Sequence, residues 1–247
     1  MAREFSRPAL SYIGRHITIN YVPRIKKCVQ LLTSLSAFQH VRSLDIGVTS
    51  KSSNPEDYLE EQLTILEIFA QRQTLTRLWL SNLPFPSIES CKREKIQDIV
   101  TALSSTVNSL GLYGCRFTSY ADMISFVRAF PHCDSLYIRD CVTGGEKSAG
   151  AMFSGLTKHK LSLDTLELTS GSSNGLIIDV SSLIKDAALG VSQFSALICG
   201  VGSAEQARCV AMATSASLIQ YFQLTCTESD GFQGKCKLQL QQPFIPR

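Results

Sequence analysis

A short apolar segment recurs along the chain, and no other feature of the sequence limits the fold as strongly. Each copy has apolar residues at its first, fourth and sixth positions and mostly polar residues at its third and fifth. Five clear copies begin at Val41, Leu75, Val107, Cys133 and Leu163, two weaker ones at Phe194 and Ile219, and a degenerate one at Gly14. Successive copies lie from about 25 to about 34 residues apart, which predicts one supersecondary unit per repeat.

The alternation within each copy is typical of a strand that buries one face and leaves the other in water. The third and fifth residues of the five clear copies, which lie on the second face, are Ser43/Asp45, Arg77/Trp79, Ser109/Gly111, Ser135/Tyr137 and Thr165/Glu167. Helical apolar spacing lies between the copies, over residues 24–38, 56–71, 88–103, 120–130, 146–158, 176–189 and 204–214. Helix starts are indicated by Asn54-Pro55, by Ser119 with Asp122 as a capping box, and by Ser203 with Gln206.

One strand and one helix in each unit of about 29 residues is typical of leucine-rich repeats. We therefore predict an α/β fold that forms one domain over residues 1–247. We expect this domain to be a leucine-rich-repeat solenoid, an irregular horseshoe-like arc of about eight strands, with parallel strands inside and helices outside. The fourth residues should pair across neighbouring strands: Ile17, Leu44, Leu78, Leu110, Leu136, Leu166, Leu197 and Phe222. The competing architecture is a doubly wound sheet, whose strands are usually continuous apolar runs.

Two regions near the ends of the chain have their own character. Residues 1–30 carry six basic side chains and one acidic one, which we interpret as a solvated basic edge of the domain. Residues 219–243 fit a terminal hairpin with Cys226 and Cys236 on either side of its turn. A transit peptide is the less favoured alternative for the basic start.

The overall charge and the cysteines limit the partners and the compartment. A net charge of +3 does not indicate a nucleic-acid-binding protein. The uncharged stretches at residues 187–204 and 209–227 are interrupted by polar residues, so we expect no membrane span. Nine cysteines without a C-x-x-C pair indicate a reducing compartment, the cytoplasm or the nucleus. Cys115 and Cys141, at the ninth repeat position, should point inward.

The polar side of the strands is the candidate binding site, on the concave face of the arc. Aromatic and arginine side chains dominate the energetics of many protein interfaces. Trp79 and Tyr137, on either side of the Gly111 strand, should stand about 10 Å apart, because strands are spaced by about 4.8 Å. Gly111 would leave a shallow depression between them, and Trp79 would be exposed to solvent. The candidate residues are Arg77, Trp79, Gly111, Tyr113, Tyr137, Arg139 and Glu167. An alternative is that these aromatic residues only favour the strand conformation.

No pattern indicates catalysis, a cofactor, a metal or a small-molecule substrate. The four histidines are scattered, and His132 and Cys133 should point to opposite faces of one strand. Gly200 and Gly202 imitate a dinucleotide fingerprint, but its third glycine is replaced by Glu205, so we expect a tight strand-to-helix turn. We expect a module that binds an unidentified protein; a doubly wound enzyme is a weaker alternative.

One span in the middle of the chain resembles a known family. Residues 102–141 contain a strand, then YGCRF, a short helix that ends in FP, and SLYIRDC. This order is similar to the repeat region of a large fungal group of F-box-like leucine-rich-repeat proteins. The resemblance implies that an F-box would recruit a Skp-type adaptor of a cullin ubiquitin ligase, while the repeats would hold a substrate. We expect no F-box before Ile17, so the chain would be a repeat-only binding protein, a truncated product or a fragment.

Overall fold

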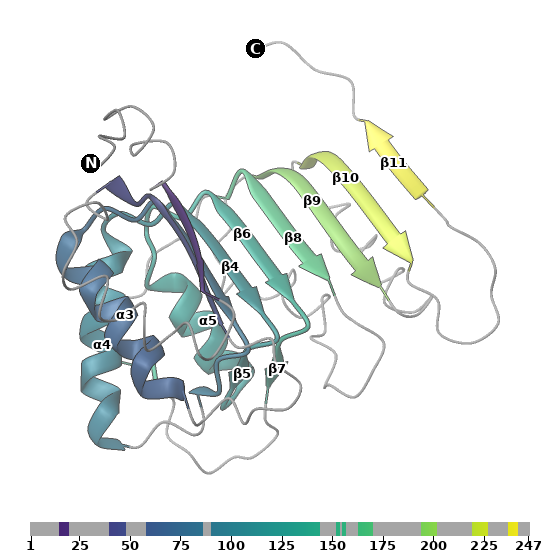
Figure 1. Cartoon of the computed structure of the whole chain (residues 1–247). Helices are drawn as coiled ribbons and strands as arrows, with labels where there is room; N and C mark the ends of the chain where they lie inside the picture. The colour runs from purple at the N-terminus through teal and green to yellow at the C-terminus, as the bar shows by residue number, and fades with distance from the viewer. Residues whose placement is uncertain are drawn as a thin grey trace, which may run out of the picture.

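The computed structural model describes residues 15–19, 40–47, 58–85, 90–143, 152–153, 155–156, 163–169, 194–201, 219–226 and 237–241. Over these residues the fold is α/β, with one long sheet and helices packed on one of its faces (Figure 1). The strands of this sheet are β1 (His16–Ile19), β2 (Ser43–Gly47), β3 (Arg77–Ser81), β4 (Ser109–Tyr113), β6 (Ser135–Arg139), β8 (Thr165–Thr169), β9 (Phe194–Val201), β10 (Ile219–Cys226) and β11 (Lys237–Gln241). The helices are α3 (Leu59–Arg72), α4 (Ser90–Ser104) and α5 (Tyr120–Arg128).

The strands of the long sheet lie in the order in which they occur in the chain. All neighbours from β1 to β10 are parallel, and only β11 runs antiparallel, against β10. A doubly wound sheet reverses its order around a central strand, so that alternative is wrong. The β10–β11 pair is the predicted terminal hairpin; Cys226 lies in β10, and Cys236 lies outside the described residues.

The register of the strands also follows the prediction. The eight fourth-position residues, from Ile17 to Phe222, form one continuous row of paired positions across the sheet. Ile17, the first residue of the row, is half-buried, and the other members whose side chains are described are buried. Leu44, Leu110 and Leu136 have no exposed surface. A shift by one residue would turn each leucine toward the open face, so burial of the row specifies the register.

The helices agree with the predicted spans only in the middle of the chain. The structure confirms the helices expected over residues 56–71, 88–103 and 120–130 as α3, α4 and α5. The helix predicted over residues 146–158 is wrong where it can be judged, because Met152, Phe153, Gly155 and Leu156 lie in turns or bends. The remaining predicted helices, at residues 24–38, 176–189 and 204–214, fall outside the described residues. So do the start signals Asn54-Pro55 and Ser203 with Gln206.

The start of α5 contains half of the predicted capping box. The Ser119 hydroxyl accepts a hydrogen bond from the Asp122 backbone N–H at 3.1 Å. The Asp122 carboxylate does not reciprocate; its Oδ1 accepts from the backbone N–H of Phe153 at 2.8 Å. Because a buried N–H needs an acceptor, this bond attaches the Met152–Phe153 turn to the helix layer. Gln97 on α4 holds the same turn by donating from Nε2 to the Met152 carbonyl at 2.6 Å.

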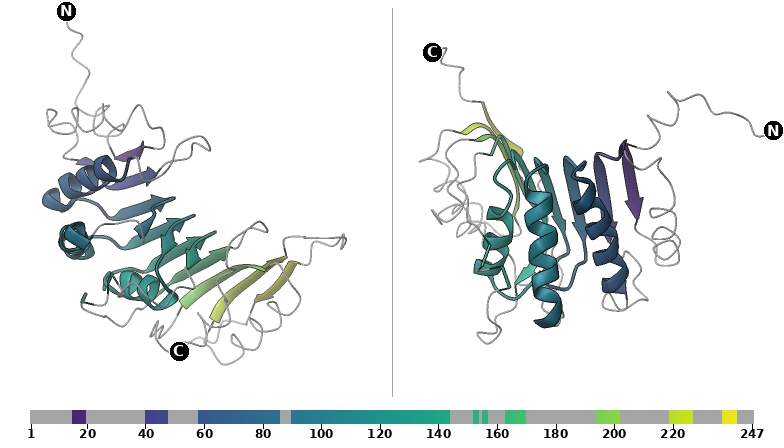
Figure 2. Two further views of the ribbon diagram at one scale, coloured as in Figure 1. Left: turned by 90° about the horizontal axis from the view of Figure 1, so that it is seen from below. Right: turned by 90° about the vertical axis from the view of Figure 1, so that its left-hand side faces the viewer.

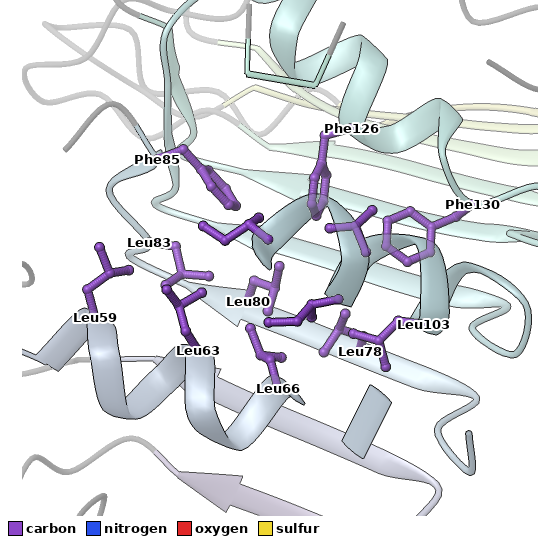
Figure 3. Close-up of a pocket in the computed structure, with 13 residues that line it drawn as sticks. Leu59, Leu63, Leu66, Leu78, Leu80, Leu83, Phe85, Leu103, Phe126 and Phe130 are labelled. Atoms are coloured by element: carbon purple, nitrogen blue, oxygen red, sulfur yellow. The ribbon is translucent and has the colours of Figure 1, made fainter. Parts of the chain in front are cut away.

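The core between sheet and helices is apolar and closely packed. Beside the leucine rows lies a group of phenylalanines with ring centroids 4.7 to 5.8 Å apart: Phe85, Phe117, Phe126, Phe130 and Phe153. A cavity of about 20 Å³ lies among leucine, isoleucine, valine and phenylalanine side chains of α3, α4, α5, β3 and the segments that follow β3 and α5. Figure 3 shows the side chains that line it. A cavity with only apolar walls stays dry and holds no polar ligand. We interpret it as a packing defect.

Three successive strands end in the same turn. Asn82, Gly114 and Asp140 occupy equivalent positions just after β3, β4 and β6, with φ angles of 56°, 61° and 51°. Asparagine, aspartate and glycine adopt this left-handed conformation more readily than other residues. The N–H of Asn82 donates to the Tyr113 carbonyl at 2.7 Å, and that of Gly114 to the Arg139 carbonyl at 2.8 Å.

A small second sheet follows these turns and was not predicted. It consists of β5 (Arg116–Phe117) and β7 (Val142–Thr143), which pair in parallel. Each strand has only two residues, too few for an alternation that sequence analysis would detect.

Candidate functional site

The candidate site is the face of the sheet opposite α3, α4 and α5 (Figure 2). Three parallel rows of residues cross this face, because the third, the fifth and the seventh residue of each copy pair with their counterparts on the next strand. From β1 to β8 the central row is Thr18, Asp45, Trp79, Gly111, Tyr137 and Glu167, and it continues onto β9 with Ile198. It brings four of the predicted site residues into one line.

The aromatic pair in this row differs from the prediction. The ring centroids of Trp79 and Tyr137 are 5.3 Å apart and the rings are stacked, with 28° between their planes. The expected separation of two strand spacings is wrong, because both side chains lean over the intervening strand. The expected depression at Gly111 is also wrong: a Cβ built there would lie 2.7 Å from Trp79 Cδ2. The missing side chain makes room for the indole ring.

Trp79 is half-buried, so the prediction of a fully exposed indole is also wrong. Its Nε1–H is closed to solvent and finds no hydrogen-bond acceptor among the residues that the structure describes. A buried donor without a partner costs roughly 1–3 kcal/mol. The fold therefore keeps this tryptophan on the open face at a cost in stability, although a phenylalanine would supply the same stacking surface without the unpaired donor.

A second aromatic contact lies in the next row of the face. Tyr113 has 37% of its surface exposed, and the Arg139 guanidinium carbon lies 5.3 Å from the Tyr113 ring centroid. Arg139 Nε is also 3.6 Å from an Asp140 carboxylate oxygen. These two contacts direct the Arg139 guanidinium toward Tyr113, its partner on β4, and toward Asp140, the next residue in the chain. Arg77 is exposed in the opposite outer row, and Glu167 is half-buried in the central row, between Tyr137 and Ile198.

A polar cluster on β1 and β2 was missed in the sequence. His16 Nδ1 is 2.7 Å from Ser43 Oγ, and His16 Nε2 is 2.9 Å from Thr18 Oγ1. Burial raises the pKa of the neighbouring Asp45 carboxyl, and the charge of His16 opposes this shift. The signal was present in the repeat, since aligning the degenerate first copy with the second places His16 beside Ser43.

The cluster does not assemble a hydrolytic site. Both ring nitrogens of His16 are engaged with hydroxyl groups, and no hydrogen bond joins His16 to Asp45 within the described residues. A serine nucleophile needs a histidine that a third group orients, and an oxyanion site beside it. His16 and Thr18 are exposed, and no described pocket opens beside them.

The buried cysteines have structural environments. Cys115 and Cys133 are buried, and the Cys115 thiol donates to the Leu80 carbonyl at 3.2 Å. Burial is the main cause that raises the pKa of Cys133 to about 12. His132 beside it is exposed, but both residues lie before β6 and not on one strand as predicted. A hydrogen bond to Cys115, together with burial, raises the pKa of Cys141. The raised pKa values keep the thiols of Cys133 and Cys141 protonated and unreactive at neutral pH.

Other sequence-based candidates also resolve into structural roles. Gly200 lies within β9, paired with Thr225, so it does not form the predicted turn; Gly202 lies outside the described residues. Two lysines of α4 form ion pairs with α3: Lys92 pairs with Glu60, and Lys95 Nζ lies 2.7 Å from a Glu67 carboxylate oxygen. In the part of the chain that the structure describes, no group of three or more histidine, cysteine or acidic residues could hold a metal ion.

No protein-family model matches the sequence, and no curated protein shows significant similarity to it. Among the described helices, none has both the length and the apolar character required to cross a bilayer.

Proposed function

We propose that this chain is a leucine-rich-repeat protein whose open sheet face binds another protein without catalysis. The architecture supports the repeat assignment, because parallel strands stack in chain order and the described helices cover one face only. In a solenoid each repeat contacts mainly its neighbours, and the uncovered strand face serves as an extended binding surface. We place the protein in the cytoplasm or nucleus, which the three buried free cysteines support.

The observation that carries the proposal is the stack of Trp79 and Tyr137 over Gly111. Two half-buried aromatic side chains on an uncovered face offer rigid apolar area at a small cost in side-chain entropy. The unpaired indole N–H is unfavourable for folding, so stability alone does not account for a tryptophan here.

Affinity capture followed by quantitative binding tests the proposal. A partner captured by the full chain should be purified and titrated against the wild type, Trp79→Ala and Tyr137→Ala. We expect each variant to lose at least tenfold in affinity, since truncation of a central aromatic residue often costs about 2 kcal/mol or more. The control is Glu94→Ala, on the exposed side of α4. Equal affinities for all four proteins would overturn the proposal.

A second candidate is the substrate receptor of an F-box ubiquitin ligase, which only the resemblance of residues 102–141 favours. Calorimetry with a purified Skp-type adaptor separates the candidates. We expect no complex, and a micromolar or tighter one would favour the ligase role.

A further inference from the structure

The central row of the open face has carboxylates on both sides of its aromatic pair. Asp45 is the direct cross-strand partner of Trp79, and Glu167 is the direct partner of Tyr137. Opposite residues on neighbouring strands lie about 5 Å apart, within reach of one bound side chain. Each half of the row therefore presents an aromatic ring beside a carboxylate.

Neither carboxylate has an ion-pair partner among the described residues. Asp45 is half-buried, and its carboxyl interacts electrostatically with the His16 ring, whose nitrogens are both hydrogen-bonded to hydroxyls. Glu167 is half-buried too, while Arg139 on the neighbouring strand is directed to Tyr113 and Asp140. Among the described residues, the row thus holds two partly desolvated acids without an ion pair, and only Asp45 is partly compensated, by the charge of His16.

We propose that this row binds an arginine-bearing segment of the partner protein, with a guanidinium stacked on the Trp79–Tyr137 pair and paired with Asp45 or Glu167. The inference rests on the proposed function, because it names the chemistry of the segment that the same face would take. A planar guanidinium stacks on aromatic rings and forms bidentate hydrogen bonds with carboxylates, whereas an ammonium group acts as a compact point charge.

The arrangement also disfavours two other occupants. An acidic segment would place further negative charge beside Asp45 and Glu167. A second copy of the chain, docked face to face on a two-fold axis along the strands through Gly111, would set Asp45 against Glu167 of the other copy. Like charges brought together in a partly desolvated interface strongly destabilise the complex.

Titration with a designed peptide tests the inference. Trp79 is the only tryptophan, so its emission reports binding at this row directly. The probe is a capped heptapeptide of glycine and serine with arginine at its second and sixth positions. Matched peptides carry citrulline or glutamate at the same two positions; citrulline keeps the planar shape of arginine but has no charge. We expect a saturable change in Trp79 emission with the arginine peptide, weakened by salt, and at least tenfold weaker binding of the citrulline peptide.

Charge-neutralising variants complete the experiment. Asp45→Asn and Glu167→Gln should each weaken binding of the arginine peptide about fivefold or more. Asp98→Asn is the control, because it makes the same change of net charge on the exposed side of α4. Urea unfolding of each variant checks that it remains folded.

Three results would overturn the inference: equal binding of the citrulline and arginine peptides, tighter binding of the glutamate peptide, or an equal loss in Asp98→Asn. Failure here is separable from failure of the proposed function. If a purified partner depends on Trp79 and Tyr137 while the arginine peptide does not bind, the face is a binding site and only its preference for a cation is wrong.

Discussion

The two faces of the sheet are formed by alternate residues of the same strands, yet they obey different rules. On the covered face, Leu78, Leu110 and Leu136 repeat one residue type at one position, and each is almost completely buried. On the open face, the neighbouring positions hold an arginine, a serine, an acid, a tryptophan or a glycine, with no common type. Packing specifies the first set, because each side chain must fill the space under a helix. The second set is free to serve another purpose.

The sharpest way to break this comparison is to truncate a leucine of the covered face and to compare it with an exposed residue of α4. Leu136→Ala should lower the free energy of unfolding by ~2 to 5 kcal/mol, because it removes buried apolar surface and leaves a cavity. The measurement is a urea titration followed by circular dichroism. Glu94→Ala is the control and should change the value by less than about 0.5 kcal/mol. Similar midpoints for the two variants would contradict the burial of the leucine row.

Asp122 offers a test of the polar link within the covered side. Asp122→Ala leaves the buried N–H of Phe153 without its acceptor and should cost about 1–3 kcal/mol. Asp122→Asn keeps an acceptor oxygen and should be milder.

Asp122 should also make the stability of the protein depend on pH. Burial is the main cause that raises the pKa of Asp122 above its usual value of 3.8. The folded protein therefore binds this proton more tightly than the unfolded chain does, and the contribution of Asp122 to stability falls as the pH rises from about 4 through the raised pKa. Urea midpoints at pH 4 and pH 7 should show Asp122→Asn gaining relative to the wild type at the higher pH. An unchanged difference would contradict the raised pKa.

Gly111→Ala tests the close approach that forms the aromatic stack. The new Cβ would lie 2.7 Å from Trp79 Cδ2, so the indole must move away from the strand. We expect a loss of roughly 1 to 3 kcal/mol, typical of overpacking, and a shift in the emission of Trp79. Ser135→Ala, in an outer row, is the matched control. An unchanged spectrum for Gly111→Ala would mean that the indole does not rest on this residue.

The smallest effects are expected for the stack itself. Trp79→Ala removes an aromatic contact and should cost about 0.5–1.5 kcal/mol, less than Leu136→Ala. Trp79→Phe keeps a ring over Gly111 and removes the unpaired N–H, so its urea midpoint should equal or exceed that of the wild type. If Trp79→Ala unfolds the protein, the tryptophan belongs to the core and the contrast between the faces disappears.

The comparison also explains which features could be predicted from the sequence. Strand positions, their order and their register follow from a repeated alternation, since burying one face leaves a single solution. Cys115 and Cys141 were predicted to point inward from their ninth position in the repeat, and both are buried. The helix predicted around Met152 and Phe153 was wrong, because two side-chain hydrogen bonds from other helices hold this segment in a turn.

The geometry of the candidate site could not be predicted as well from the sequence. Spacing between strands predicted a gap between Trp79 and Tyr137, but the direction of a side chain above a sheet depends on its neighbours. The absent Cβ of Gly111, interpreted as an empty space, allows the two rings to meet. The His16 cluster was missed because its residues lie far apart in the chain and come together only through the register of β1 and β2.

The matching turns after β4 and β6 have a consequence for how such a chain can change in length. Gly114 and Asp140 leave the sheet with nearly the same backbone conformation, at equivalent positions of adjacent repeats. A deletion of residues 115–140 would join Gly114 to Cys141 with the direction of the chain unchanged, and β4 would meet β8 across an equivalent register. Whole repeats are thus interchangeable segments, through which gene duplication or excision could lengthen or shorten the molecule without designing a new junction.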